Sequence, residues 1–168
     1  LALQDALPNA FIKRGGRNSY RVENHNNMKQ LCRELFALVQ IETSAEVELL
    51  EDSPKDQRVN LLSNMVFPYV RHSSRQIREI VKALPEERKN LIFATYIGSR
   101  RSKRDRAGRA LEYGYPIQFD ILAGFAEYRD LQRHRMLTQQ RQDLGIDLGY
   151  SIDRKSTRLN SSHVVIAY

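Results

Sequence analysis

The sequence lacks the features of disulfide-stabilised, membrane-spanning and exported proteins. Its single cysteine, Cys32, excludes an internal disulfide and a metal site built from cysteines, as expected in a reducing cytosol. No apolar run approaches the roughly 18 residues of a membrane-spanning helix. No charged start followed by an apolar segment is present, so no signal peptide is indicated. We therefore expect a cytoplasmic protein without a membrane partner.

What the sequence does contain suits one basic, globular domain. The 168 residues, 41% of them hydrophobic, are sufficient for a substantial core. Lys and Arg number 27 against 20 Asp and Glu, which gives a formal net charge of +7. A basic balance favours phosphate-bearing partners, either nucleotides or nucleic acid, without choosing between them. Because the chain starts at Leu1 rather than at Met, we expect a fragment of a longer protein.

The two ends of the chain differ from its middle. Residues 153–168, DRKSTRLNSSHVVIAY, change abruptly in character and resemble translated sequencing-adapter read-through. Residues 151–168 are therefore expected to be a foreign or disordered tail. Residues 1–43 are expected to be an N-terminal helical segment, which could be the end of a preceding repeat. This leaves residues 44–150 as the main domain, truncated at its native ends.

The N-terminal segment holds one strong helical pattern, preceded by turns and short extended pieces over residues 1–22. Asn24 or Asn26 is available as its N-cap. Cys32 lies within the apolar stripe, which favours a buried structural thiol over a reactive one. The stripe recurs at helical spacing at Met28, Leu31, Cys32, Leu35, Phe36 and Val39.

Residues 44–100 predict two strands followed by two helices. Residues 45–50 alternate apolar and acidic side chains, and residues 59–67 are apolar enough for a central strand. Ser73 and Ser74 can cap a helix that ends at Pro85, and the next helix begins there and closes at Gly98. With the strand and helix that follow, the order indicates an α/β or α+β fold, a central mixed sheet with helices packed on it.

Residues 116–134 predict a strand that leads directly into a helix. Ile117, Phe119 and Ile121 alternate with polar neighbours, as in a half-buried strand, and Gly124 interrupts the pattern. Apolar residues then recur at helical spacing from Phe125. The polar face of this helix carries Arg129, Asp130, Arg133 and His134.

The end of this helix is the place where chemistry is most strongly indicated. Continued as a helix, the chain would turn Arg135 onto the apolar side, and burial of an unpaired guanidinium is costly. Either the helix stops at His134 or Arg135 meets an anionic partner.

The stretch 108–142, GRALEYGYPIQFDILAGFAEYRDLQRHRMLTQQRQ, resembles the signature region of flavin-dependent thymidylate synthases, whose hallmark is RHR followed at a fixed distance by Ser. The resemblance extends less strictly back to about Val47. It implies methylation of dUMP to dTMP, with methylenetetrahydrofolate as carbon donor, reduced FAD as hydride donor and NADPH as reductant. It also implies a homo-oligomer, a homotetramer in that family, so the fragment is expected to be inactive alone.

By this resemblance FAD would be held by Arg133, His134, Arg135 and Arg141. The dUMP site would comprise Asp130, Arg133, Arg141, Gln142 and Asp143. No catalytic residue is assigned. Asp143 stands where the family has Ser, and Arg141 where it usually has Glu. These departures leave open an alternative, a non-catalytic structural repeat of the same family.

A basic loop over residues 99–109 offers a further alternative. Its only acid is Asp105, and its cations are Arg100, Arg101, Lys103, Arg104, Arg106 and Arg109. It could be a solvated loop or could fold over a nucleotide in the oligomer. It could also make the chain a nucleic-acid-binding module, although no interleaved aromatic residue is present for base stacking.

Overall fold

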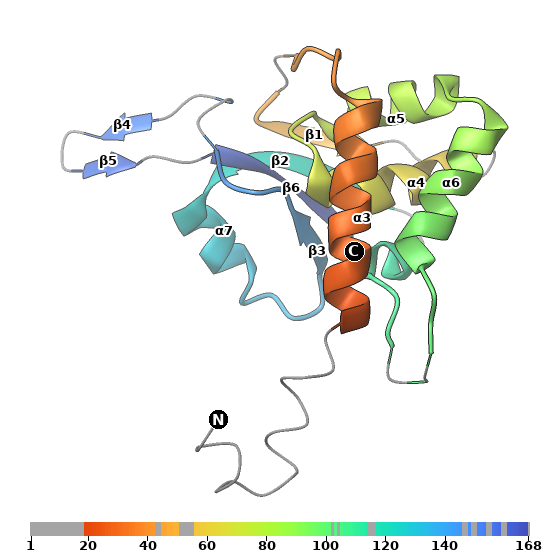
Figure 1. Cartoon of the computed structure of the whole chain (residues 1–168). Coiled ribbons are helices and arrows are strands. Elements are labelled where there is room, and N and C mark those ends of the chain that lie inside the picture. Colours follow the sequence, from red (N-terminus) through yellow and green to blue (C-terminus); the bar gives the residue numbers. More distant parts are fainter. Residues whose placement is uncertain are drawn as a thin grey trace, which may run out of the picture.

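The computed structural model describes residues 19–42, 45–50, 56–101, 103, 105–113, 117–145, 148, 151–153, 156–158 and 161–167. The fold is α+β (Figure 1). Its α-helices are α3 (Ser19–Leu35), α4 (Gln57–Val66), α5 (Ser74–Ala83), α6 (Glu86–Ile97) and α7 (Phe125–Leu131), and its 3₁₀ turns are η2 (Phe67–Tyr69) and η3 (Arg109–Glu112). Most of the turns expected over residues 1–22, together with Arg104, lie outside the described residues.

The strands form two antiparallel sheets. The larger has the order β1 (Val47–Leu50), β2 (Gln118–Gly124), β6 (Ser161–Ala167) and β3 (Thr138–Arg141). The smaller pairs β4 (Ser151–Asp153) with β5 (Ser156–Arg158). Every pairing in the described part of the chain is antiparallel, so the expectation of a mixed sheet is wrong. In Figure 1 the strands β2, β3 and β6 lie with α7 on one side of α3, and α6 lies on the other.

Strand β6 comes from the tail that the sequence patterns set aside. Its backbone lies between β2 and β3, pairing with residues 118–124 on one side and residues 138–141 on the other. The foreign origin of this tail and the boundaries near residues 43 and 150 stay predictions.

Residues 59–67, expected as a central strand, form helix α4 and the first residue of η2. The prediction failed because a short, largely buried run has no clear periodicity that separates strand from helix, and here polar Asn60, Ser63 and Asn64 are buried with the apolar residues. The expected central position is correct. Leu62, Met65 and Val66 are at most 1% exposed, and α4 packs against both α5 and α6.

Local signals at helix ends predicted α5 and α6 correctly. The Ser73 side chain accepts a hydrogen bond from the Gln76 amide and so caps α5. Helix α6 follows Pro85, carries Glu86 and Glu87 in its first turn and ends at Gly98, whose φ is 56°. That left-handed conformation favours glycine.

Helix α3 begins at Ser19, earlier than the expected caps at Asn24 or Asn26. The Asn24 amide instead donates to the Tyr96 and Ile97 carbonyl oxygens, at 3.3 and 3.2 Å. It therefore satisfies carbonyl groups that are left open at the C-terminus of α6. This contact joins α3 to α6, although the two residues are more than seventy positions apart in the sequence.

Among the residues whose side chains are described, the main hydrophobic core lies among the helices. Cys32 is buried within it as a free thiol, which confirms its predicted structural environment. None of the core residues belongs to a strand. The core comprises Met28, Leu31, Cys32, Phe36, Leu62, Met65, Val66, Phe67, Val70, Ile77, Val81, Ile92, Tyr96, Ala110 and Tyr113.

A polar layer joins the sheet to the helices. Asp120 is 2% exposed and accepts a 2.7 Å hydrogen bond from the Ser74 amide at the N-terminus of α5. Gln118, also 2% exposed, accepts a 2.8 Å hydrogen bond from Arg78. Helix N-termini favour negative charge, which accounts for a carboxylate at this buried position. The sheet is thus attached to α5 through its polar face.

Candidate functional site

The polar attachment leaves the apolar face of β1 and β2 uncovered in the described structure. Val47 is paired with Ile121 and Leu49 with Phe119 across the two strands, so all four side chains lie on one face. Val47 and Leu49 are 58% and 57% exposed, and Ile117, on the same face, is 44% exposed. We call this surface the outer face. It consists of Val47, Leu49, Ile117, Phe119 and Ile121.

The alternation predicted from the sequence is therefore correct. The buried residues of β2 are Gln118, Asp120 and Ala123, so the polar side chains of the alternating stretch face the helices. The outer face carries no charged residue, because Glu48 and Asp120 belong to the other face. An uncharged apolar surface on a chain of net charge +7 is a candidate interaction site.

The predicted binding residues around α7 are exposed. Helix α7 ends at Leu131, before the expected end at His134, and successive turns follow it. Arg133 and Asp130 form a 3.4 Å ion pair with each other, and their side chains are 78% and 73% exposed. His134 and Arg135 are also exposed. Solvent competes strongly with such a pair, so its contribution to stability is small.

The other predicted binding residues lie in three separate environments. Arg141 lies over the rings of Phe125 and Tyr128, with its guanidinium carbon 5.9 and 5.2 Å from the ring centroids, as in a cation–π contact. Gln142 is 1% exposed and donates to the His72 carbonyl oxygen at 2.7 Å. Asp143 points to Lys29 at 3.8 Å and is 72% exposed. The predicted set is thus not gathered around one cavity.

The basic loop keeps most of its described cations in solvent. Arg100, Arg101, Lys103 and Arg106 are exposed. Asp105 accepts a hydrogen bond from the Arg101 amide at 2.8 Å. Arg109 reaches Glu112 at 3.7 Å. This arrangement corresponds to the solvated loop among the alternatives.

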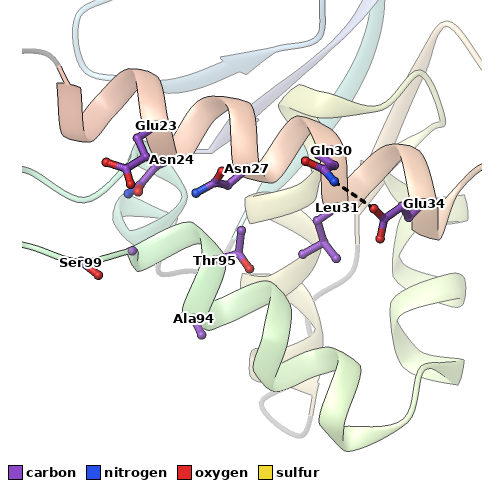
Figure 2. Close-up of a pocket in the computed structure, with 10 residues that line it drawn as sticks. Glu23, Asn24, Asn27, Gln30, Leu31, Glu34, Ala94, Thr95 and Ser99 are labelled. Carbon is purple, nitrogen blue, oxygen red and sulfur yellow. Dashed lines mark hydrogen bonds between the residues drawn. The ribbon is translucent and has the colours of Figure 1, made fainter.

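A groove runs between α3 and α6 (Figure 2). It has a volume of about 450 Å³. Figure 2 shows carboxamide and carboxylate side chains of α3 along one wall, with the Gln30 amide donating to Glu34 at 3.3 Å. Thr95 and Ser99 contribute hydroxyl groups from the other wall. Among the described residues that line it, none has a cationic side chain.

A second cavity, of about 410 Å³, lies between β1 and the helices α4 and α5. Its charged residues on α5 were missed at the level of sequence. Their spacing in the sequence could have indicated a shared charged surface, because it places the four residues on one helix face, away from the buried Ile77 and Val81. They are Arg75, Arg78, Glu79 and Lys82.

Comparisons with known proteins relate this chain to proteins named UPF0159. One from Chlamydia muridarum is 39% identical over 109 residues, which are 65% of this chain and 20% of that protein. One from Chlamydia pneumoniae is 33% identical over 132 residues, 79% of this chain and 24% of that protein. One from Thermoplasma acidophilum is 25% identical over 127 residues, 75% of this chain and 25% of that protein. The chain thus spans about a fifth to a quarter of these relatives.

No family model matches the chain, and no solved structure matches it. The assignment to the flavin-dependent thymidylate synthases is therefore corrected: the matching proteins carry a name that states no activity. The departures at Arg141 and Asp143 are the residues at which the signature fails. We therefore do not propose a dUMP-methylating activity for this chain, nor a role as a non-catalytic repeat of that family or as a nucleic-acid-binding module.

Other expectations are untested by these findings. FAD, NADPH, methylenetetrahydrofolate and dUMP as ligands, the residues assigned to them, the homo-oligomer and the cytoplasmic location stay predictions. Within the described ranges, no helix combines the length and apolarity needed to cross a bilayer.

Proposed function

We propose that this chain is an assembly module that associates with a second copy of itself through the outer face. The observation that supports this proposal is the exposure of Val47, Leu49 and Ile117 on a surface without charge. Interfaces between identical subunits are more apolar than other protein surfaces, and charge is depleted at their centres. Since each copy carries a net charge of +7, an uncharged contact surface also avoids placing like charges opposite each other.

The apolar surface is sufficient for a modest affinity. Complete burial of an aliphatic or aromatic side chain contributes about 1.5 to 3 kcal/mol. Val47, Leu49 and Ile117 are 58%, 57% and 44% exposed, so burial of these three side chains in both copies gains about 5 to 9 kcal/mol. Loss of translational and rotational freedom costs about 4 to 15 kcal/mol. A dimer of weak to moderate affinity is therefore expected, which requires measurement over a wide concentration range.

Sedimentation velocity over a concentration series tests the proposal. The parent chain should shift from monomer to dimer as its concentration rises. Val47→Lys and Ile117→Lys each place a charge in the contact and should weaken the dimer by at least about tenfold, or ~1.4 kcal/mol. Leu38→Lys is the matched control, because Leu38 is 97% exposed and lies outside the outer face.

Circular dichroism of each variant verifies the fold, which should be unchanged because the substituted side chains are largely exposed. A parent chain that remains monomeric throughout the series contradicts the proposal. So does a dimer that Val47→Lys and Ile117→Lys leave as stable as Leu38→Lys does.

A further inference from the structure

The cavity between β1, α4 and α5 has walls of opposite charge. Helix α5 contributes Arg75, Arg78 and Lys82, and the opposite wall contributes Glu48 of β1 and Asp56 at the start of α4. Glu79 of α5 adds a third carboxylate. The lining therefore holds three cations and three carboxylates, two of them opposite α5, in a cavity of about 410 Å³, within the size range of small-ligand sites.

Two long ion pairs span this cavity. Arg75 Nε lies 3.5 Å from Glu48, and Lys82 Nζ lies 3.7 Å from Asp56. Charge-assisted hydrogen bonds are normally about 2.7 to 2.9 Å long, so both pairs are loose. The Lys82 and Asp56 side chains are 69% and 41% exposed, and Arg75 is 55% exposed against 25% for Glu48. A ligand can replace the Lys82–Asp56 contact at little cost, because exposed pairs contribute at most about 1 kcal/mol.

Arg78 and Glu79, consecutive residues of α5, bring a cation and a carboxylate to the cavity lining. Arg78 donates to the buried Gln118 amide oxygen at 2.8 Å, which holds its guanidinium at the cavity floor. Glu79 is exposed and makes no hydrogen bond or ion pair within the described part of the chain. Because residues four apart share a helix face, Glu79 and Arg75 lie on the same side of α5.

Apolar side chains complete the cavity. Leu50 and Val59 line it beside the nearly buried amide of Asn60. A ligand that carries only an anion would meet three carboxylates, and one that carries only a cation would meet three basic groups. A zwitterion with an apolar substituent can pair its carboxylate with the lining cations and its ammonium group with a lining carboxylate, while the substituent contacts the apolar side chains.

We propose that this cavity binds a small zwitterion of the α-amino-acid class. The ligand carboxylate binds to the guanidinium groups of Arg75 and Arg78, and its ammonium group binds to Glu79. Its side chain packs against Leu50 and Val59. Leu49 lines this cavity and also belongs to the outer face, whereas Val47 and Ile117 do not line it, so Val47→Lys and Ile117→Lys test self-association without changing the cavity lining.

Isothermal titration of the chain with three probes tests the site. L-Leucine carries both charges, L-leucinamide lacks the carboxylate, and N-acetyl-L-leucine lacks the ammonium group. L-Leucine should bind at least about tenfold more tightly than either analogue, since each analogue leaves one wall without its partner. Saturation by no probe, or equal binding of all three, overturns the proposal.

Two variants then assign the two charges. Glu79→Gln should remove the preference for L-leucine over N-acetyl-L-leucine, and Arg75→Gln should remove the preference over L-leucinamide. Both side chains are exposed, so the fold should persist. Glu87→Gln on α6 is the matched control and should leave all three affinities unchanged. A leucine preference that survives in both cavity variants overturns the proposal.

Discussion

Replacement of Asp120 tests the polar layer that attaches the sheet to α5. Its carboxylate accepts the Ser74 amide hydrogen bond at 2.7 Å, and its side chain is almost completely buried. Asp120→Ala removes this acceptor and leaves a helix N-terminal amide without it. Asp120→Asn keeps an oxygen acceptor of the same shape and removes only the charge. The pair of variants therefore separates the hydrogen bond from the electrostatic interaction with the helix.

The expected loss for Asp120→Ala is about 1 to 3 kcal/mol in free energy of unfolding. An unsatisfied buried donor costs about 1 to 3 kcal/mol. Loss of a negative charge at a helix N-terminus adds about 0.3 to 1 kcal/mol. Glu48 is the cross-strand partner of Asp120, and relief of this like-charge contact returns about 0.2 to 1 kcal/mol. Asp120→Asn should cost less than about 1 kcal/mol, because its charge terms nearly cancel.

Urea unfolding followed by circular dichroism measures both losses. The experiment is best done with Val47→Lys as the background, so that self-association does not contribute to stability. Asp143→Ala is the control. Its exposed carboxylate lies 3.8 Å from Lys29, and its loss should change stability by less than about 0.5 kcal/mol. If Asp120→Ala is as stable as this control, the polar layer does not hold the sheet to α5.

Two further predictions concern α3 and α6. Gly98→Ala should lower the thermal midpoint, because φ at Gly98 is 56° and an added Cβ would clash with Asn24 Oδ1. In an Asn24→Ala background the additional loss should be smaller, and equal losses in the two backgrounds would exclude the clash. Burial raises the pKa of the Cys32 thiol to about 12, so a disulfide reagent at neutral pH should react only after denaturation. The unfolded thiol ionises near pH ~8.5, so the stability contributed by burial of the neutral Cys32 thiol is complete below that pH and is lost as pH rises toward 12. The urea midpoint should therefore fall less steeply with pH in Cys32→Ser than in the parent chain, and identical pH profiles would contradict this assignment.

Sequence patterns predicted the elements whose ends are fixed locally. The Ser73 cap, Pro85 and Gly98 define α5 and α6 through their own backbone preferences. Strands β1 and β2 were each predicted from alternation, but their pairing with each other was not. Helix α4 was not predicted, because its apolar and polar residues are buried together, Asn60, Ser63 and Asn64 included, so that packing against α5 and α6 decides its conformation.

The candidate interaction site was harder to predict than the strands that carry it. Alternation establishes that β2 has a polar and an apolar face, but it does not state which face the rest of the chain covers. That choice depends on Ser74 and Arg78, which are distant in sequence and bind Asp120 and Gln118. The basic residues 133–135 were predicted to bind a ligand, yet their side chains are exposed to solvent in the structure.

Because the helical core is separate from the sheet, the helices can maintain the fold while the sheet provides the interaction surface. Substitutions on the outer strands do not alter the volume filled by Met28, Met65 or Ile92, so the sheet can change its partner while the helices preserve the architecture. Evolution can therefore vary recognition and folding in this chain almost independently. Divergent relatives would then share their helical packing even where they no longer recognise the same neighbour.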